Sequence, residues 1–334
     1  MRTAFIDALT ELAALDERIW LLTGDLGFSV LERFAARFPE RYLNVGVAEQ
    51  NMTGIAAGLA RCGKIPFTYS IANFPTLRCL EQIRNDVCYH EANVKIVAVG
   101  GGYAYGPQGY THHGVEDLGV MRVLPGMTVV APGDPVEARL ATRMIAQWDG
   151  PCYLRLGKAN EPLVHRDEPE FARGRAIEVR SGGDATLIST GGMLKECDET
   201  AARLAVEGIA TRVLSMPTVK PLDEDAVLRA ARETRAVVTV EEHSIVGGLG
   251  SAVAEVLAES SETCRFRRFG VPDRLQRAVG SQEYLRGLAG DLHATVVALL
   301  LDAPEDARNR RGDPPHEVPA VPHFTRASLP EHRS

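Results

Sequence analysis

One carboxylate is conspicuous in the sequence because it interrupts a stretch of small and apolar residues, NVGVAEQNM (44–52). If a helix covers residues 47–60, Glu49 shares one face with Met52 and points into the protein rather than to water. It also lies in the first turn, where the helix dipole favours a negative charge. Two interpretations remain open: a carboxylate that accepts backbone hydrogen bonds at a helix start, or a desolvated acid that hydrogen-bonds a ligand nitrogen.

Two adjacent histidines, His112 and His113, lie in the glycine-containing stretch YGPQGYTHHGVEDL (105–118). Imidazole is the side chain best suited to proton transfer near neutral pH. Neighbouring side chains on an extended segment point apart, so we do not expect this pair to share a metal ion.

Aromatic residues and an acidic turn provide further candidates. The stretch PFTYSIANF (66–74) predicts a strand followed by a loop, and its aromatic side chains either pack in the core or stack on a flat ligand. The core interpretation fits Phe67 best. Asp25, within TGDLG (23–27), is typical of a turn with an Asp-x-Gly sequence.

The elements that must position these residues alternate between short apolar runs and helical patterns. The sequence predicts strands and loops over residues 18–27, 94–102, 184–192, 210–223 and 236–244, and a strand, turn and helix over residues 127–148. This alternation is typical of parallel α/β architecture. Ligands in such sheets bind at the loops that follow the strand ends.

The length of 334 residues suits two globular units. We expect a first domain over residues 1–160, a polar linker over 161–180, and a second α/β domain over 181–302. Residues 303–334 contain few large apolar side chains and predict a flexible tail.

The composition restricts the partners. The net charge of −7 favours neither a nucleic-acid backbone nor an anionic membrane, and no run of apolar residues approaches membrane-spanning length. A small-molecule substrate is therefore expected. The six cysteines are scattered without a CxxC pair or zinc-like spacing, which fits reduced thiols and a cytoplasmic location.

Several ordered motifs resemble enzymes of the transketolase group, which use thiamine diphosphate. TGDLG, NVGVAEQNMTGIAAGLARCGKIPFTYSIANF and THHGVEDLGVMRVLPGM resemble the pyrimidine-binding domain of that group. MPTVKPLD and VVTVEEHSIVGGLGSAVAEVL resemble its C-terminal domain. The resemblance covers roughly residues 3–300, and an ordered set of motifs is far more specific than a single glycine-rich loop.

The resemblance implies a role for Glu49 in cofactor chemistry. The matching glutamate bonds the N1′ nitrogen of the aminopyrimidine ring, and the shared proton favours the tautomer that activates the thiazolium carbon. Phe74 matches the ring that stacks on the aminopyrimidine, and Tyr69 and Ile71 are expected to line the same pocket. Asp25 matches an acid near the cofactor.

The resemblance also implies substrate contacts. His112 matches the histidine that contacts the sugar oxygens and assists proton transfer, whereas His113 is a weaker candidate. Lys158 matches a phosphate-binding arginine, and Arg155 lies nearby in the same segment, LRLGK (154–158). A lysine still binds phosphate but lacks the bidentate fork of arginine.

Two residues depart from the pattern of the family. Transketolases carry Asp-Gly-Pro-Thr-His where this chain has QGYTH (108–112), so Gln108 replaces an acid that recognises the acceptor hydroxyl and Tyr110 replaces proline. Both departures lie on the acceptor side. They leave open whether the acceptor is an ordinary aldose phosphate.

The resemblance further implies a partner chain. The cofactor diphosphate needs Mg²⁺ held by oxygen ligands, which this superfamily supplies from a Gly-Asp-Gly motif that does not occur in the sequence. The chain therefore resembles the small, C-terminal-half subunit of a split transketolase. We expect a separate N-terminal-half subunit to hold the diphosphate and Mg²⁺, with none of the metal ligands in this chain, in an α2β2 heterotetramer.

The expected activity is transfer of a two-carbon ketol unit from a ketose or ketose phosphate to an aldehyde acceptor. The β subunit of a 2-oxoacid dehydrogenase E1 component remains an alternative because it has the same two-domain plan. A 1-deoxyxylulose-5-phosphate synthase has a similar Thr-His-His loop but is normally one long chain. A non-catalytic regulatory subunit is a third alternative, which the combination of Glu49, Phe74 and His112 disfavours.

Overall fold

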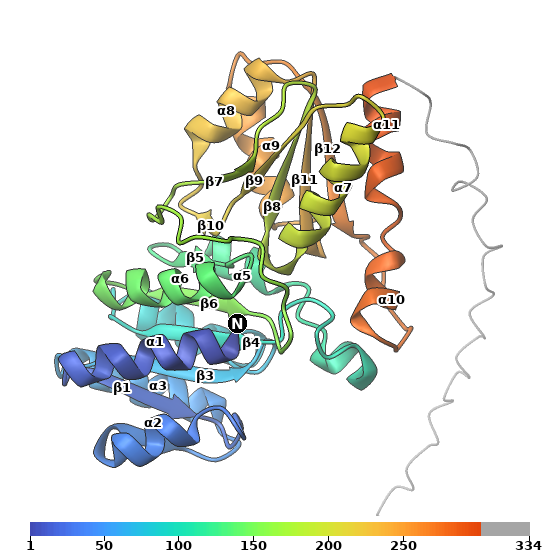
Figure 1. The fold of residues 1–334 in the computed structure, drawn as a ribbon. Coiled ribbons are helices and arrows are strands. Elements are labelled where there is room, and N and C mark those ends of the chain that lie inside the picture. Colours follow the sequence, from blue (N-terminus) through green and yellow to red (C-terminus); the bar gives the residue numbers. More distant parts are fainter. Residues whose placement is uncertain (302–334) are drawn as a thin grey trace, which may run out of the picture.

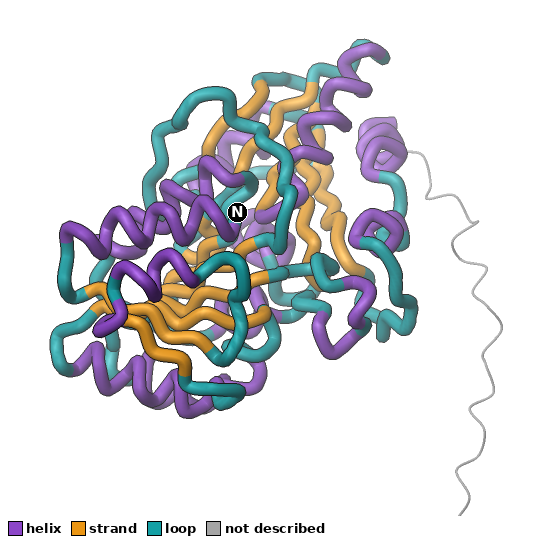
Figure 2. The backbone as a smooth tube through the Cα atoms, turned by 60° about the horizontal axis from the view of Figure 1, so that its bottom comes forward, coloured by secondary structure: helices purple, strands orange, loops and turns teal. Residues whose placement is uncertain are grey.

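The chain folds into two β-sheets, each lying between layers of helices (Figure 1). The computed structural model describes residues 1–301, and the predicted tail (303–334) lies outside the described residues. Figure 2 shows the strands of each sheet between helical segments. The predicted α/β fold class, with two mostly parallel sheets, is confirmed.

The first sheet has seven strands in the order β10-β5-β6-β4-β3-β1-β2, and only the pair of β10 with β5 is antiparallel. Its strands are β1 (Ile19–Thr23), β2 (Tyr42–Asn44), β3 (Ile65–Ile71), β4 (Lys95–Val99), β5 (Thr128–Val130), β6 (Cys152–Leu156) and β10 (Thr218–Lys220). Strand β4 is buried along its whole length, as expected for a parallel strand with helices on both faces.

Helices cover both faces of this first sheet. On one face Phe5 of α1 packs against Phe67 of β3, and on the other Met52 of α3 lies in a second apolar cluster. The helices are α1 (Arg2–Leu15), α2 (Glu32–Arg37), α3 (Glu49–Arg61), α4 (Leu80–Gln82), α5 (Asp117–Val123) and α6 (Pro135–Gln147). Short 3₁₀ or π-helical turns in this part of the chain are η1 (Pro39–Arg41), η2 (Leu77–Cys79), η3 (Ile83–Cys88), η4 (Gly106–Gln108) and η5 (Tyr110–His112), and a further turn, η6 (Gly191–Met193), follows a strand of the second sheet.

The second sheet has five strands in the order β12-β11-β8-β9-β7, and only the pair of β7 with β9 is antiparallel. Its strands are β7 (Ile177–Arg180), β8 (Ala185–Thr190), β9 (Thr211–Ser215), β11 (Ala236–Ser244) and β12 (Arg265–Val271). Its helices are α7 (Leu194–Val206), α8 (Glu224–Glu233), α9 (Leu249–Glu259), α10 (Gln282–Gly287) and α11 (Leu292–Leu301). Residues of α7 and α11 contribute to one apolar cluster, and residues of α8 and α9 to another.

One segment passes from the second sheet to the first. The sequence predicted a single strand over 210–223 in the second domain, but the structure has β9 in one sheet and β10 in the other. The N–H of Met216 still donates to the carbonyl of Ser189 at 2.7 Å. The carbonyl of Pro217 instead accepts the N–H of Ala131 at 2.8 Å. Because proline has no N–H, it ends the ladder in the second sheet and the chain crosses to β5.

The connector between the sheets, predicted as a linker over residues 161–180, is held in place by hydrogen bonds to α6. Its last four residues, 177–180, form β7, although the sequence predicted a linker through residue 180. The carboxylate of Asp134, which also caps α6, accepts the N–H groups of Val164 and His165 at 3.0 and 2.9 Å. The imidazole Nε2 of His165 lies 2.7 Å from Glu137 Oε1, so the connector is tied to the start of α6 by side-chain and backbone contacts.

The pair of His165 and Glu137 predicts a pH-dependent contribution to stability. Burial opposes the charged imidazole, but the hydrogen bond and charge of Glu137 outweigh it and raise the pKa of His165 above 6.5. The contribution is complete below the unfolded-state pKa and is lost as pH rises through the higher folded-state pKa.

We therefore expect His165→Gln to lower the free energy of unfolding more at pH 6 than at pH 9, measured by urea unfolding at both values. His90→Gln, at an exposed position, is the control. An equal loss for His165→Gln at both pH values would contradict the assignment.

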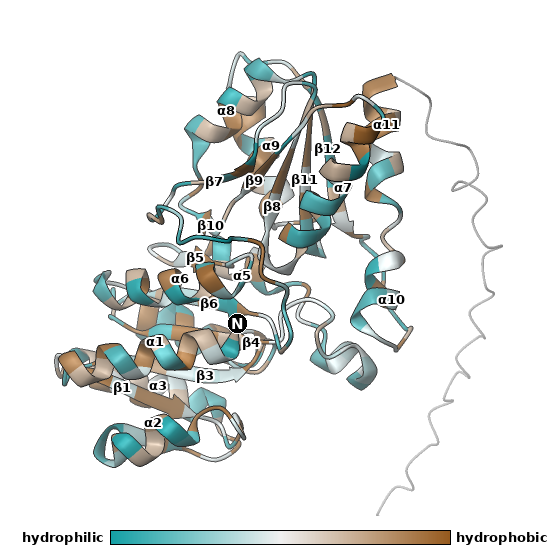
Figure 3. Ribbon diagram, viewed as in Figure 1, coloured by the Kyte–Doolittle hydropathy of each residue, from teal (hydrophilic) through white to brown (hydrophobic). Residues whose placement is uncertain are grey.

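The sequence predicted no stretch of membrane-spanning length, but residues 282–301 of the described chain are long and apolar enough to cross a membrane. The stretch consists of two helices, α10 and α11, rather than one, and 22% of it is buried. The helix α11 is largely apolar (Figure 3), and its residues Leu292, Val296 and Leu300 lie in the core of the second sheet. A helix that packs on a core has the same composition as a membrane span, so this feature is weak evidence for one.

Candidate active site

Helix α3 begins at Glu49 and places its carboxylate inside the protein, as the sequence predicted. The residue is 2% exposed. Its Oε2 accepts a hydrogen bond from Arg78 Nη1 at 2.8 Å, and Ser70 Oγ lies 3.5 Å from Oε1. A Cβ atom at Gly24 would lie 3.3 Å from Glu49 Cγ, so the glycine that follows β1 leaves room for the carboxylate.

Phe74 and His112 complete a cluster around this carboxylate. The Cζ atom of Arg78, which pairs with Glu49, lies 4.4 Å from the centroid of the Phe74 ring. The His112 ring meets Phe74 edge-on, with centroids 5.3 Å apart and an angle of 71°. The structure thus brings together the three residues that the sequence singled out as a set. Sequence reasoning missed Arg78. The only feature of the sequence that could have pointed to it is its position four residues after Phe74.

The two histidines point to different surroundings, as predicted. His112 is half-buried, and its Nδ1 lies 3.0 Å from Thr111 Oγ1. His113 is 1% exposed, its Nε2 lies 3.2 Å from the carbonyl oxygen of Gly106, and its ring packs perpendicular to Tyr103. His113 is therefore part of the loop's core, and only His112 shares the cluster with Phe74. Within residues 1–301, no group of three or more His, Cys, Asp or Glu residues is arranged to hold a metal ion.

Asp25 lies in a turn at the end of β1. It is exposed and has a φ of 58°, a left-handed conformation in which asparagine, aspartate and glycine are favoured. Its Oδ1 accepts from Asn44 Nδ2 at 3.0 Å, and its backbone N–H donates to Asn44 Oδ1 at 3.0 Å. The turn interpretation is thus supported, and the cofactor role of Asp25 stays a prediction.

Tyr69 and Ile71 do not share the pocket of Glu49, in contrast to the expectation. Side chains alternate along β3, so Ser70 faces Glu49 while Tyr69 packs in the opposite apolar cluster with Phe5. Tyr69 and Ile71 line a separate cavity of about 210 Å³. Burial raises the pKa of Tyr69 well above its usual value, so its phenol is neutral at physiological pH.

Of the remaining substrate candidates, Lys158 lies beside a residue that lines this smaller cavity. Arg2 and Tyr105 line it, and Lys158 Nζ lies 4.6 Å from the centroid of the Tyr105 ring. Gln108 and Tyr110 are exposed on the following turns. The hydroxyl of Tyr110 donates to Glu116 Oε1 at 3.2 Å, and the charge of Glu116 raises the pKa of Tyr110.

Arg155 lies in the contact between the two sheets. It is 4% exposed, and its Nε donates to Asp117 Oδ2 at 2.8 Å. Its Nη2 donates to the carbonyl oxygens of Gly114 at 2.6 Å and Glu242 at 2.9 Å. Because these donors are committed inside the protein, the geometry does not support the predicted substrate role. Arg155 is instead a structural anchor between α5, β6 and β11.

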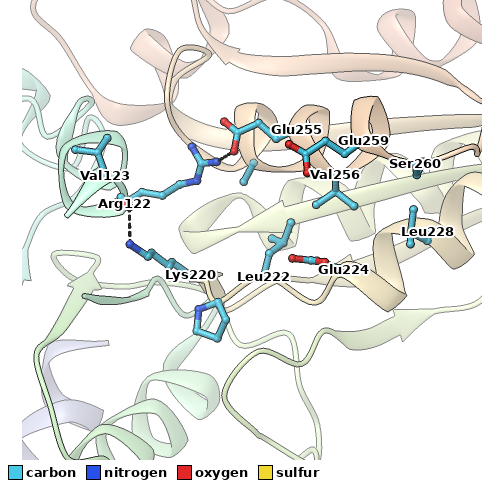
Figure 4. A pocket seen from close by; sticks show the side chains of 12 residues that line it. Arg122, Val123, Lys220, Leu222, Glu224, Leu228, Glu255, Val256, Glu259 and Ser260 are labelled. Carbon is cyan, nitrogen blue, oxygen red and sulfur yellow. Dashed lines mark hydrogen bonds and ion pairs between the residues drawn. The ribbon is translucent and has the colours of Figure 1, made fainter. Parts of the chain in front are cut away.

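A larger cavity of about 630 Å³ lies in a groove lined by α5, α8 and α9, and none of the candidate residues lines it (Figure 4). The two cationic side chains that line it, Arg122 and Lys220, have partners within the protein. Arg122 pairs with Glu255, and Lys220 Nζ donates to the carbonyl oxygens of Arg122 and Leu124 at 2.9 and 2.6 Å. The Glu49 cluster therefore remains the candidate site, and the cations of this groove are committed within the protein.

The Glu49 cluster fits one kind of ligand. A buried carboxylate accepts a hydrogen bond from a ring N–H, an aromatic face stacks on a flat ring, and a neighbouring imidazole exchanges protons with a bound oxygen. An aminopyrimidine is flat and carries ring and exocyclic nitrogens. The residues present therefore fit the aminopyrimidine half of thiamine diphosphate.

Comparison with known families agrees with this fit. Residues 1–162 match the family model described as the transketolase pyrimidine-binding domain, and residues 174–289 match the transketolase C-terminal domain. The chain therefore belongs to the transketolase family and is a transketolase-type, transferase-like subunit. Membership of this family implies the use of thiamine diphosphate.

Known relatives include subunits of two transketolases. The chain is 44% identical to the 6-deoxy-6-sulfo-D-fructose transketolase subunit of Clostridium sp. strain MSTE9, over 86% of this chain and 88% of the relative. It is 41% identical to one of the subunits of apulose-4-phosphate transketolase from Phocaeicola vulgatus, over 81% and 87% of the two chains. A solved structure described as a split gene transketolase, inactive β4 tetramer, is 41% identical, with a TM-score of 0.81 over 90% of this chain and 97% of that chain.

Proposed function

We propose that this chain is the pyrimidine-binding subunit of a two-chain transketolase that moves a two-carbon ketol unit from a ketose to an aldehyde acceptor. The observation that carries the proposal is the cluster of Glu49, Phe74 and His112 within one site. When bound, thiamine diphosphate supplies the carbanion chemistry that carries the two-carbon unit.

The residues of this chain have separate tasks in the proposed reaction. Glu49 holds a proton at the pyrimidine N1′ position, and its 2% exposure keeps that proton from exchanging freely with water. Phe74 orients the pyrimidine plane by stacking. His112 is half-buried beside this ring, where it exchanges a proton with the oxygens of the sugar.

A separate subunit is proposed to hold the diphosphate and Mg²⁺. The sequence lacks a Gly-Asp-Gly motif, and the names of the two relatives describe subunits of transketolases. Mg²⁺ prefers oxygen ligands from carboxylates and phosphates, which the partner and the cofactor would supply. The description of the related solved structure as an inactive tetramer of β chains supports dependence on the partner. An α2β2 heterotetramer is the assembly we propose.

The proposed substrate carries an anionic group. Arg2 and Lys158 lie around Tyr105 at the smaller cavity. The two relatives are named for a sulfonated sugar and a sugar phosphate. Two cationic side chains beside this cavity suit either anion, because both present several oxygen acceptors.

Lys158→Met should therefore raise KM for a ketose phosphate about tenfold, in line with the loss of one hydrogen bond to a charged group. The value for the dephosphorylated ketose should not change. Steady-state kinetics of the assembled enzyme with both substrates measure the effect, and Lys195→Met on α7 is the control. An equal change for both substrates would contradict an anion contact at Lys158.

The proposal is tested by co-expressing this chain with a candidate partner that carries a Gly-Asp-Gly motif. The complex receives thiamine diphosphate, Mg²⁺ and a panel of ketose phosphates and sulfonates, and aldose release is followed with each acceptor. Activity that requires both chains supports the proposal. Cofactor binding without aldose release, together with decarboxylation of a 2-oxo acid, would overturn it in favour of an E1-type subunit.

A further inference from the structure

The guanidinium of Arg78 contacts both groups that the proposed function assigns to the aminopyrimidine. Its Nη1 donates to Glu49 Oε2 at 2.8 Å, and its Cζ lies 4.4 Å from the centroid of the Phe74 ring. A guanidinium is flat, donates hydrogen bonds in its plane and stacks on aromatic faces. An aminopyrimidine with a proton at N1′ presents the same set of groups: a flat ring, an in-plane N–H donor and a face for stacking.

The burial of the ion pair is strongly asymmetric. The side chain of Glu49 is 1% exposed, whereas that of Arg78 is 44% exposed. A buried carboxylate without a partner is strongly disfavoured, so Glu49 requires a donor whether or not a cofactor is bound. The arginine has no such constraint, because its charged end can be solvated in water.

The backbone of Arg78 is held independently of its side chain. Its carbonyl accepts a hydrogen bond from Gln50 Nε2 at 3.0 Å, and its N–H donates to the carbonyl of Asn73 at 3.3 Å. The side chain can therefore rotate toward solvent while η2 keeps its position. A long side chain on a fixed backbone moves on a timescale far shorter than catalysis.

We infer that Arg78 is an internal substitute for the aminopyrimidine, which pairs with Glu49 and stacks on Phe74 before the cofactor binds and is displaced by it. The inference rests on the proposed function. The guanidinium occupies the hydrogen-bonding position at Glu49 Oε2, and the side chain of Glu49 is 1% exposed, so a ligand that bonds this oxygen must displace Arg78. Arg78 and the aminopyrimidine therefore compete for the same site, and Arg78 lowers the apparent affinity for cofactor.

The competition predicts an unusual result for a substitution inside a binding site. Arg78→Met should tighten the binding of thiamine diphosphate to the complex with the partner about tenfold, because the charge-assisted hydrogen bond that the cofactor must displace is gone. Arg78→Lys keeps the charge but not the flat donor, and its affinity should lie between the two. Titration calorimetry with thiamine diphosphate and Mg²⁺ measures all three affinities. Arg84→Met, at an exposed arginine on η3 that bonds Asn85, should bind as the unmodified protein does.

Thermal unfolding provides a readout that does not depend on catalysis. Without cofactor, Arg78→Met should melt at a lower temperature than the unmodified complex, because Glu49 has lost its partner. With saturating cofactor the difference should disappear. In a Glu49→Gln background, Arg78→Met should have no further effect on either quantity, since the two residues act as a pair.

Other outcomes identify which idea fails. Weaker or unchanged cofactor binding in both Arg78→Met and Arg78→Lys would overturn the competition, because it would mean that Arg78 supports or ignores the bound cofactor. The proposed function would be unaffected if Glu49→Gln still weakened cofactor binding or abolished turnover. If Glu49→Gln changed neither, the assignment of the pyrimidine site itself would be wrong.

Discussion

Glu49→Gln should lower kcat of the assembled enzyme by about 10²–10⁴-fold, the range typical of a lost general acid or base. The amide has nearly the same shape as the carboxylate but cannot hold and release a proton at the pyrimidine nitrogen. Turnover of a ketose and an aldehyde at saturating thiamine diphosphate measures the effect. Turnover within a factor of about 3 of the unmodified enzyme would exclude this acid–base role.

A matched control separates the loss of the catalytic role of Glu49 from the general effect of removing a negative charge. Glu199 is an exposed glutamate on α7 that pairs with Lys195 at 3.4 Å. Surface pairs of this kind contribute little to stability, so Glu199→Gln should leave both kcat and unfolding unchanged. Glu49→Gln should also remain folded, because it removes a buried charge and leaves the half-exposed Arg78 free to reach water.

Arg155→Met should lower the free energy of unfolding by about 3–5 kcal/mol, the range for breaking a buried ion pair by removing one partner. The substitution leaves the fully buried Asp117 without its cation and removes the donor to the carbonyls of Gly114 and Glu242. Methionine retains most of the apolar stem of arginine, so the decrease in the free energy of unfolding reports mainly on the lost polar contacts. Urea and thermal unfolding of the chain provide the measurement.

The corresponding control is an arginine in a partly exposed pair. Arg180 Nη2 lies 2.8 Å from Asp198 Oδ1 with 38% of the arginine side chain exposed, and Arg180→Met should cost less than about 1 kcal/mol. Equal effects at the two positions would contradict the anchoring role of Arg155. Unchanged stability with a raised KM for a sugar phosphate would instead restore its predicted substrate role.

Much of the candidate site could be predicted because its signals are local. The helix that begins at Glu49 follows from a run of small residues with helical spacing, and the inward direction of the carboxylate follows from the same spacing. The separation of His112 from His113 follows from the geometry of neighbouring residues. The motifs that resemble the transketolase group were sufficient to predict the family.

Other parts of the site could not be predicted because they depend on which helix packs on which face of a buried strand. The sequence of β3, IPFTYSI, alternates large apolar side chains with smaller ones, but both of its faces are buried, so the alternation does not tell which face meets Glu49. The placement of Tyr69 away from Glu49 therefore became visible only once α1 and α3 were packed on opposite faces. The pair of Glu49 and Arg78 joins residues 29 positions apart and leaves no periodic signal.

The sequence by itself determined the α/β class, the order of most helices and strands, the inward-facing carboxylate and the family, because these follow from short-range spacing and ordered motifs. Only the tertiary structure decided that β10 joins the first sheet, that Arg155 anchors the contact between the sheets, and that Arg78 pairs with Glu49. Each of these depends on contacts between residues far apart in the chain. Such contacts are set by how the two sheets pack and by where buried charges find partners, which local pattern does not encode.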